Sequence, residues 1–179
     1  RLCAADLLNE AEHGTDSATL LITTSSSFAD RVEVELERQL AALPDVRATA
    51  ARAALGPNGG CVLVASLDEA AEVANLWAPE HLQIAVAPEH ETELLDLLVN
   101  AGEILVGQST LFSAGNFVIG CPASLPTGGF AHVSSGITAD TFLKRTAVAK
   151  ADAAALRRMT PTILAMSRSE EHTSELQSL

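Results

Sequence analysis

A carboxylate and an imidazole stand side by side at Glu80 and His81, within the segment APEHL (78–82). An imidazole exchanges a proton near neutral pH, and a carboxylate can accept a proton from water or polarise it. Pro79 restricts the backbone before the pair, so both side chains are expected to leave the turn in a fixed relation. Two interpretations follow: an acid–base pair, or a solvated turn between two apolar segments.

A second pair of functional groups lies near the N-terminus, where residues 5–14 (ADLLNEAEHG) have the spacing of a helix. Glu10 and His13 are three residues apart, so they project from one helix face and can hold one metal ion. The pair alone is a weak signal, and the alternative interpretation is a solvated helix face.

Four short apolar segments predict buried strands, and helical patterns separate them. The segments are TLLITT (19–24), CVLVA (61–65), LQIAV (82–86) and EILVG (103–107). The helical patterns begin near Ser27, at Ser66, which forms a capping box with Glu69, and at Pro88. This alternation predicts parallel strands covered on both faces. The expected fold class is α/β, a three-layer, Rossmann-like and incomplete parallel sheet with helices on both faces, followed by C-terminal helices.

Residues 1–138 are expected to form this α/β domain, which carries the metal and acid–base residues. Within it, 108–136 has no hydrophobic period, and long irregular segments inside compact folds are usually functional. Residues 139–167 are expected to be a helical extension towards a missing C-terminal region. Residues 168–179 resemble the translation of a sequencing-library adapter. His172 is therefore not a candidate site residue.

Charge and composition exclude several classes of function. The net charge of −12 repels phosphate backbones, so we expect no nucleic-acid partner. No apolar run reaches the roughly 18 residues that cross a bilayer, so we expect no membrane partner. Cys3, Cys61 and Cys121 lack C-x-x-C spacing and indicate reduced thiols in a cytoplasm. We interpret Cys121 as a small buried filler rather than as a nucleophile, because no partner base can be identified for it.

Along nearly its whole length the chain resembles the histidinol dehydrogenase family. The matching segments, in the family's order, are ADLLNEAEHG, LERQLAALP, NLWAPEHLQI, AGEILVGQST, GNF, LPTGGFA and SSGITADTFLKR. The resemblance implies a zinc-dependent, cytoplasmic homodimer that oxidises the small alcohol L-histidinol to L-histidine, using NAD twice and passing through an aldehyde. The chain would be a central-to-C-terminal fragment, inactive by itself, with its NAD contacts upstream of Arg1.

The resemblance assigns catalysis to the pair in APEHL. His81 would accept the hydroxyl proton as hydride leaves, and Glu80 would activate water for attack on the aldehyde. The chemistry agrees with the assignment, because imidazole titrates near neutrality and a carboxylate can polarise a water.

The resemblance also implies one zinc ion per subunit, held by Glu10, His13 and Asn116, with a histidine beyond this chain as the fourth ligand. The family has glutamine and aspartate where this chain has Glu10 and Asn116, so a carboxylate is gained at one position and lost at the other. We interpret the two exchanges as a retuned metal site; the alternative is two unrelated substitutions. These residues and His81 are also the expected substrate contacts.

The substrate pocket departs further from the family pattern. Ala123 stands where the family motif GPNHVLPT has its histidine, and an alanine side chain neither donates nor accepts a hydrogen bond. The family's TAR motif is replaced by FAH, which ends at His132. Three functions are therefore considered: histidinol oxidation, a paralogous dehydrogenase for another small polar alcohol or diol, and a non-catalytic binding or structural homologue. The retained Glu80 and His81 argue against the third.

Overall fold

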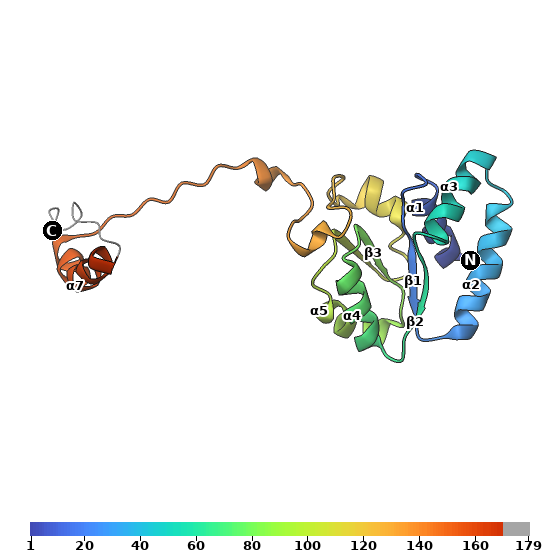
Figure 1. Ribbon diagram of the computed structural model, residues 1–179, viewed down its shortest axis with the longest axis horizontal. Coiled ribbons are helices and arrows are strands. Elements are labelled where there is room, and N and C mark those ends of the chain that lie inside the picture. The colour runs from blue at the N-terminus through green and yellow to red at the C-terminus, as the bar shows by residue number, and fades with distance from the viewer. Residues whose placement is uncertain (170–179) are drawn as a thin grey trace. The chain divides into compact units, whose positions relative to one another are not determined.

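The computed structural model describes residues 1–169, which fall into two compact units (Figure 1). The first unit is Arg1–Thr141, and the second begins at Phe142. In chain order the described elements are α1 (Leu2–Ala11), β1 (Leu20–Thr23), α2 (Ser26–Leu40), α3 (Asp45–Leu55), β2 (Gly60–Leu63), α4 (Leu67–Trp77), β3 (His81–Ile84), α5 (Pro88–Leu97), β4 (Glu103–Val106), α6 (Phe112–Ala114), η1 (Gly115–Ile119), η2 (Phe130–His132), η3 (Ala139–Phe142) and α7 (Ala153–Ser169).

The four strands pair in parallel, as the apolar segments predict. Hydrogen bonding divides them into two pairs, β1 with β2 and β3 with β4. In the second pair the register places His81 opposite Glu103 and Ile84 opposite Val106. Helix α5 provides the crossover that parallel neighbours require. The α/β fold class is therefore confirmed, with short parallel strands flanked by helices and helices at the C-terminal end.

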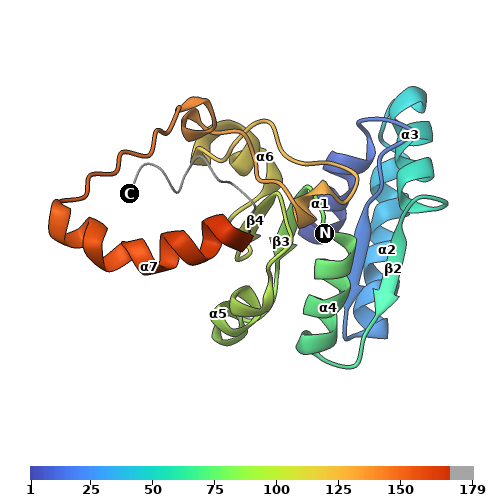
Figure 2. The ribbon, with the colours of Figure 1, turned by 60° about the vertical axis from the view of Figure 1, so that its left-hand side comes forward.

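Helices cover the strands from both sides. The β1–β2 pair lies between α2 and α3 on one side and α4 on the other (Figures 1 and 2). One apolar cluster joins α1, α2 and α3 through Leu8, Leu40 and the fully buried Ala51. A second joins α4, β3 and α5 through Ala71 and Ile84. Alanines at the contacts allow the elements to approach closely, which fits the nearly aromatic-free composition.

The helix starts agree with the sequence in part. Ser66 caps α4 by accepting a hydrogen bond from the Glu69 amide, as the capping box predicts. Helix α2 is capped by Ser25, not by Ser27, because the Ser25 hydroxyl oxygen accepts the Phe28 amide. Helix α3 was not predicted, since its alanine-rich sequence shows no clear apolar stripe.

The region after the first unit is only partly helical. The expected extension at 139–167 contains η3 and α7, but residues 143–152 form no helix. All ten are exposed, so no packed face stabilises a helix there. The adapter-like segment 168–179 lies almost entirely outside the described residues, and that interpretation stays a prediction. No helix within residues 1–169 is long and apolar enough to cross a membrane.

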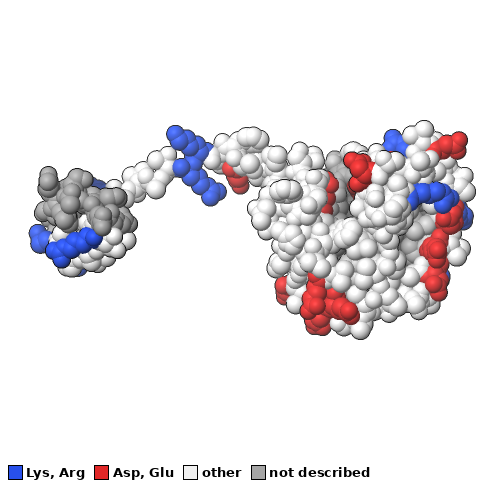
Figure 3. Space-filling view, viewed as in Figure 1, with Lys and Arg blue, Asp and Glu red and all other residues white. Residues whose placement is uncertain are grey.

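Charged side chains lie at the surface of the first unit. Acidic side chains form a patch over the ends of α4 and α5 (Figure 3).

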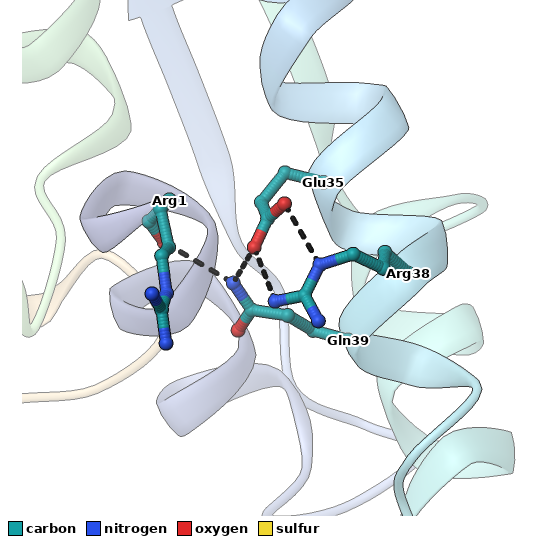
Figure 4. A network of polar contacts seen from close by, with 4 residues as sticks. All are labelled: Arg1, Glu35, Arg38 and Gln39. Carbon is teal, nitrogen blue, oxygen red and sulfur yellow. Dashed lines mark hydrogen bonds and ion pairs between the residues drawn. The ribbon is translucent and has the colours of Figure 1, made fainter.

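A network of hydrogen bonds links the start of α1 to α2. Gln39 donates to the Arg1 carbonyl oxygen at 3.2 Å and to Glu35 at 2.8 Å (Figure 4). Hydrogen bonds from Arg38, and then from Gln39, lower the pKa of Glu35 to about 2. The network lies at the surface, with Glu35 and Gln39 partly exposed, so it orients α1 on α2 without adding much stability.

Candidate active site

The APEHL segment is a helix end that turns directly into a strand. Ala78 is buried and ends α4 in the left-handed conformation, with φ 50° and ψ 62°. It is the one described residue other than glycine with a positive φ, and its amide donates to the Ala74 carbonyl oxygen at 2.9 Å. An alanine in this conformation is held there by its surroundings. Pro79 and Glu80 form the short connection, and His81 begins β3.

The neighbouring strand fixes the other side of this connection. The Gly102 amide donates to the Pro79 carbonyl oxygen, and the Glu103 amide to that of Glu80, both at 2.9 Å. A Cβ atom at Gly102 would lie 2.5 Å from the Glu80 carbonyl oxygen. Only glycine allows this approach. The fixed relation expected from Pro79 therefore has two further causes, the left-handed Ala78 and the pairing with 102–103.

His81 is the centre of the cluster. Its Nε2 lies 3.3 Å from Asn116 Oδ1 and 3.6 Å from Glu103 Oε1, and its Nδ1 lies 3.8 Å from Glu10 Oε2. The ring also packs edge-on against Phe112, with 5.5 Å between centroids. The side chain is 12% exposed. An imidazole placed among carboxylates and an amide is suited to accept and pass on a proton.

Glu80 lies within electrostatic range of the same groups. Burial raises the pKa of the Glu80 carboxyl, and the charges of Glu10 and Glu103 raise it further. His81 and His13 act in the opposite direction and lower it. A carboxylate whose pKa is raised is a stronger base than a free one, as activation of a water molecule requires.

The structure places Glu10 and His13 differently from the sequence prediction. Helix α1 ends at Ala11 with Glu12 as its C-cap, so only Glu10 is on the helix, and His13 follows it. The expected shared helix face is therefore wrong. The two residues remain linked, because the His13 amide donates to the Glu10 carbonyl oxygen at 3.4 Å. Glu10 reaches towards His81, and the His13 side chain is exposed but acts electrostatically on Glu80.

Asn116 comes from the irregular segment that the sequence marks as functional. It lies in η1, a π-helical turn, and π-helical turns often occur at functional sites. The buried Gly115 before it lets the turn approach β4, because a Cβ atom there would lie 3.0 Å from Leu105 and 3.2 Å from Glu103 Oε1. The turn thus brings the Asn116 amide to the edge of the His81 ring.

The donor set fits a zinc ion in chemical type. Glu10 and Asn116 offer oxygen and His13 offers nitrogen, and zinc accepts this mixture. Within residues 1–169, no group of three or more His, Cys, Asp and Glu side chains is arranged to hold a metal ion. The expected set contains only two residues of these types, since its third donor is the Asn116 amide. Glu10 and Asn116 lie against different nitrogens of His81, so the ring stands between them.

Glu103 is a site residue that the sequence analysis missed. It begins β4, and its side chain is 4% exposed. Its Oε1 has no hydrogen-bond partner within the described residues. A signal was present in the sequence, since Glu103 is the single charged residue of the apolar segment EILVG. It becomes the partner of His81 because 81–84 pairs with 103–106.

The residues at the altered pocket positions have different surroundings. Ala123 is exposed. His132 binds two groups outside the His81 cluster: its Nε2 lies 3.3 Å from the Leu76 carbonyl oxygen, and its Nδ1 lies 2.9 Å from Asn100 Nδ2. The Leu76 carbonyl oxygen can only accept and the Asn100 amide nitrogen can only donate, so both ring nitrogens are engaged outside the His81 cluster. Cys121 is half-buried, and a hydrogen bond with Glu103, and then burial, raise the pKa of its thiol. A raised thiol pKa opposes a role as nucleophile.

The fold and site together define an α/β protein with a histidine–carboxylate cluster of acid–base type at the first residues of two parallel strands. The sequence model of the family described as histidinol dehydrogenase matches residues 1–179. The chain belongs to the histidinol dehydrogenase family.

Named relatives and a solved structure agree with this membership. A histidinol dehydrogenase from Geobacter sulfurreducens is 40% identical over 167 residues, which are 93% of this chain and 38% of the relative. One from Synechocystis is 44% identical over 149 residues, 83% of this chain and 34% of the relative. The crystal structure of histidinol dehydrogenase from Elizabethkingia anophelis matches with a TM-score of 0.90 and 32% identity, over 99% of this chain and 40% of that one. The chain thus spans two fifths or less of the length of these relatives.

Proposed function

We propose that the protein containing this chain is an NAD-linked, zinc-dependent dehydrogenase that oxidises a primary alcohol through an aldehyde to a carboxylic acid, as histidinol dehydrogenases convert L-histidinol to L-histidine. The observation that carries the proposal is the position of His81, whose two ring nitrogens face Glu10 on one side and Asn116 with Glu103 on the other. Family membership adds the reaction class. We further propose a cytoplasmic homodimer.

His81 acts as the base in the first oxidation. It takes the hydroxyl proton of the alcohol, so that the carbon can release hydride to NAD. The nearly buried ring is fixed by Asn116 and by its contact with Phe112, which keeps one nitrogen in place for the substrate. A positioned acid–base group of this kind contributes about 10²–10⁴-fold in rate.

Glu80 acts in the second oxidation. It removes a proton from water as the water attacks the aldehyde, and the resulting hydrate can release a second hydride. The raised pKa of this carboxyl supports the role, because a stronger base activates water better. The Glu80 carboxyl interacts electrostatically with His81, Glu10 and His13, which supports its action at the same site as His81.

Glu10, His13 and Asn116 are the residues that would hold the zinc ion, with a further histidine from outside this chain. When bound, zinc supplies a Lewis acid that polarises the substrate oxygen. The chain's own contribution is two oxygen donors beside His81, from Glu10 and Asn116, and the nitrogen donor of His13. The same residues and His81 would contact the substrate.

The substrate itself has two candidates. The first is L-histidinol. The second is another small polar alcohol or diol, which Ala123 favours because it lacks the imidazole of the family motif. His132 bears less on this choice, since its ring bonds to Leu76 and Asn100.

The test is to recover the full-length gene and assay the purified protein for NADH formation with L-histidinol and with a panel of small primary alcohols and diols. Zinc per subunit is measured in parallel for the wild type, for His13→Ala and for His90→Ala, a matched control because His90 is an exposed histidine on α5. We expect about one zinc per subunit in the wild type and the control, and well below one in His13→Ala. Absence of activity with every alcohol would instead support a non-catalytic homologue.

A further inference from the structure

Glu103 has the features of a group that acts on another side chain. Its carboxylate is almost fully enclosed, and Oε1 has no hydrogen-bond partner within the described residues. A buried, unpaired carboxylate oxygen is costly, so the fold keeps it at a loss of stability. A role in the site that it faces is one physical reason for such a group.

Two independent features of the backbone direct Glu103 at His81. The parallel register of β3 and β4 makes the two residues direct partners. In addition, Gly115 leaves space above Oε1, since a Cβ atom there would lie only 3.2 Å from it. The outcome is a separation of 3.6 Å between Glu103 Oε1 and His81 Nε2.

The surroundings of the two ring nitrogens are unequal. Nε2 faces two acceptors, Asn116 Oδ1 at 3.3 Å and Glu103 Oε1 at 3.6 Å, whereas Nδ1 faces Glu10 alone at 3.8 Å. The Glu10 carboxylate is more exposed, at 24% against 4% for Glu103. Charge interactions are stronger where water is excluded, so the proton of the neutral ring is drawn to Nε2.

We propose that Glu103 is a positioning residue that holds the proton of neutral His81 on Nε2 and so leaves Nδ1 as the nitrogen that accepts the substrate proton. This inference rests on the proposed function of His81 as the base. A carboxylate that orients a catalytic imidazole fixes both its tautomer and its ring angle. Glu103 itself touches neither the substrate nor a cofactor in this account.

The remaining groups around Glu103 agree with such a role. The Cys121 thiol lies beside the carboxyl group as a weak donor. The negative charge of Glu103 contributes to the raised pKa of the Glu80 carboxyl, which makes Glu80 a better base for the second oxidation. The Glu103 carboxylate thus interacts with both members of the proposed acid–base pair.

The first test is kinetic and uses the full-length enzyme. Glu103→Gln keeps the shape but introduces an amide that can donate to Nε2, which would favour the wrong tautomer. We expect kcat for alcohol oxidation to fall about 10–100-fold, the range for loss of an outer partner of a site residue. KM and zinc content should stay close to wild type. Glu103→Asp, which retains the charge with a shorter reach, should recover part of the loss.

The control for folding is Thr19→Val. Thr19 is another buried residue whose side-chain oxygen lacks a hydrogen-bond partner within the described chain, and it precedes β1, outside the His81 cluster. Thr19→Val should leave kcat unchanged. If it lowers kcat as much as Glu103→Gln does, the effect is a general consequence of altering the core, and the proposal is wrong.

The second test reads the tautomer directly, by solid-state ¹⁵N NMR of protein labelled at the histidine rings. A spectrum of His81→Asn subtracted from that of the wild type isolates His81. We expect a protonated Nε2 and an unprotonated Nδ1 in the wild type, and a mixture or the reverse in Glu103→Gln. An Nδ1-protonated wild type, or a tautomer unchanged in Glu103→Gln, would overturn the proposal.

The two tests separate this inference from the proposed function. A wild-type protein with no dehydrogenase activity but with the expected tautomer change would refute the function and leave the role of Glu103 in place. A loss of zinc in Glu103→Gln without a tautomer change would make Glu103 a metal ligand and contradict its positioning role.

Discussion

His81 and Glu103 are direct partners in the parallel pair β3–β4, and 3.6 Å separates His81 Nε2 from Glu103 Oε1. The pairing means that the backbone hydrogen bonds of two strands, rather than a mobile loop, set the distance between imidazole and carboxylate. Each residue is the first of its strand. The geometry of the acid–base cluster therefore depends on the connection before β3 and on the turn before β4.

Gly102→Ala should disturb this arrangement without changing any functional group. The added Cβ atom would lie 2.5 Å from the Glu80 carbonyl oxygen, so the backbone of 79–80 or of 102–103 must move. Overpacking of this kind costs about 1–3 kcal/mol. We expect a lower free energy of unfolding by that amount in urea denaturation, together with reduced activity in the full-length enzyme.

Gly14→Ala is the matched control for this substitution. A Cβ atom at Gly14 would meet Asp16 Oδ1, the end of a flexible and exposed side chain that can turn away. The free energy of unfolding of the Gly14→Ala variant should stay within about 0.5 kcal/mol of wild type, as is usual for surface substitutions. Equal losses for the two variants would show that the contact with Glu80 is not what requires glycine at 102.

The exchanged residues Glu10 and Asn116 should be coupled through zinc. Glu10→Gln alone removes a negative charge, Asn116→Asp alone adds one, and the double variant restores the family's pattern. Residues that share a ligand are non-additive by about 0.5–3 kcal/mol. We expect the double variant to bind zinc more tightly than the two single effects predict, as measured by competition with a chelator. Additive effects would mean that the two exchanges are independent.

Asp6 should make stability depend on pH. Burial raises the pKa of this carboxyl above its ordinary value of 3.8, although a hydrogen bond from the Phe112 amide opposes the shift. The folded state then holds its proton more tightly than the unfolded state, so stability is lost as pH rises from about 3.8 through the folded pKa. Asp6→Asn keeps an acceptor for Phe112 and removes the charge.

Urea denaturation across pH 3–7 checks the effect of Asp6. The free energy of unfolding of Asp6→Asn should increase relative to that of the wild type as pH rises through this range. Above the folded pKa of Asp6, the difference between the two proteins should stay constant. Asp30→Asn, an exposed residue of α2, controls for the change in net charge. A difference between Asp6→Asn and wild type that shrinks with rising pH would contradict the account.

The sequence predicts the fold well where apolar period and turn chemistry agree. All four strands and the starts of α4 and α5 follow from such patterns, because buried strands and helix caps leave local signals. Helix α3 escaped prediction, since it is held by contacts of Ala51 and Ala54 with α1 and α2 rather than by a strong local pattern. Residues 143–152 have helix-forming composition but no packing partner.

The site was predictable residue by residue but not in its geometry. Motif resemblance points to Glu80, His81, Glu10, His13 and Asn116, and their roles stay predictions. The sequence does not reveal that α1 ends before His13 or that His81 stands between Glu10 and Asn116, because both depend on how distant segments pack. Glu103 carries no motif, and only the strand register shows what it faces.

The central claim is that His81 and Glu80 serve the two oxidations separately, and variants of the full-length enzyme can test it. His81→Ala and Glu80→Gln are each assayed for NADH formation with the alcohol and with the corresponding aldehyde. Glu89→Gln serves as the control, because Glu89 is exposed in the first turn of α5.

We expect His81→Ala to slow alcohol oxidation about 10²–10⁴-fold and Glu80→Gln to lose most when the aldehyde is supplied directly. Equal losses for the two variants on both substrates would contradict the division of roles. Rates close to wild type for both variants would contradict the assignment of catalysis to APEHL itself.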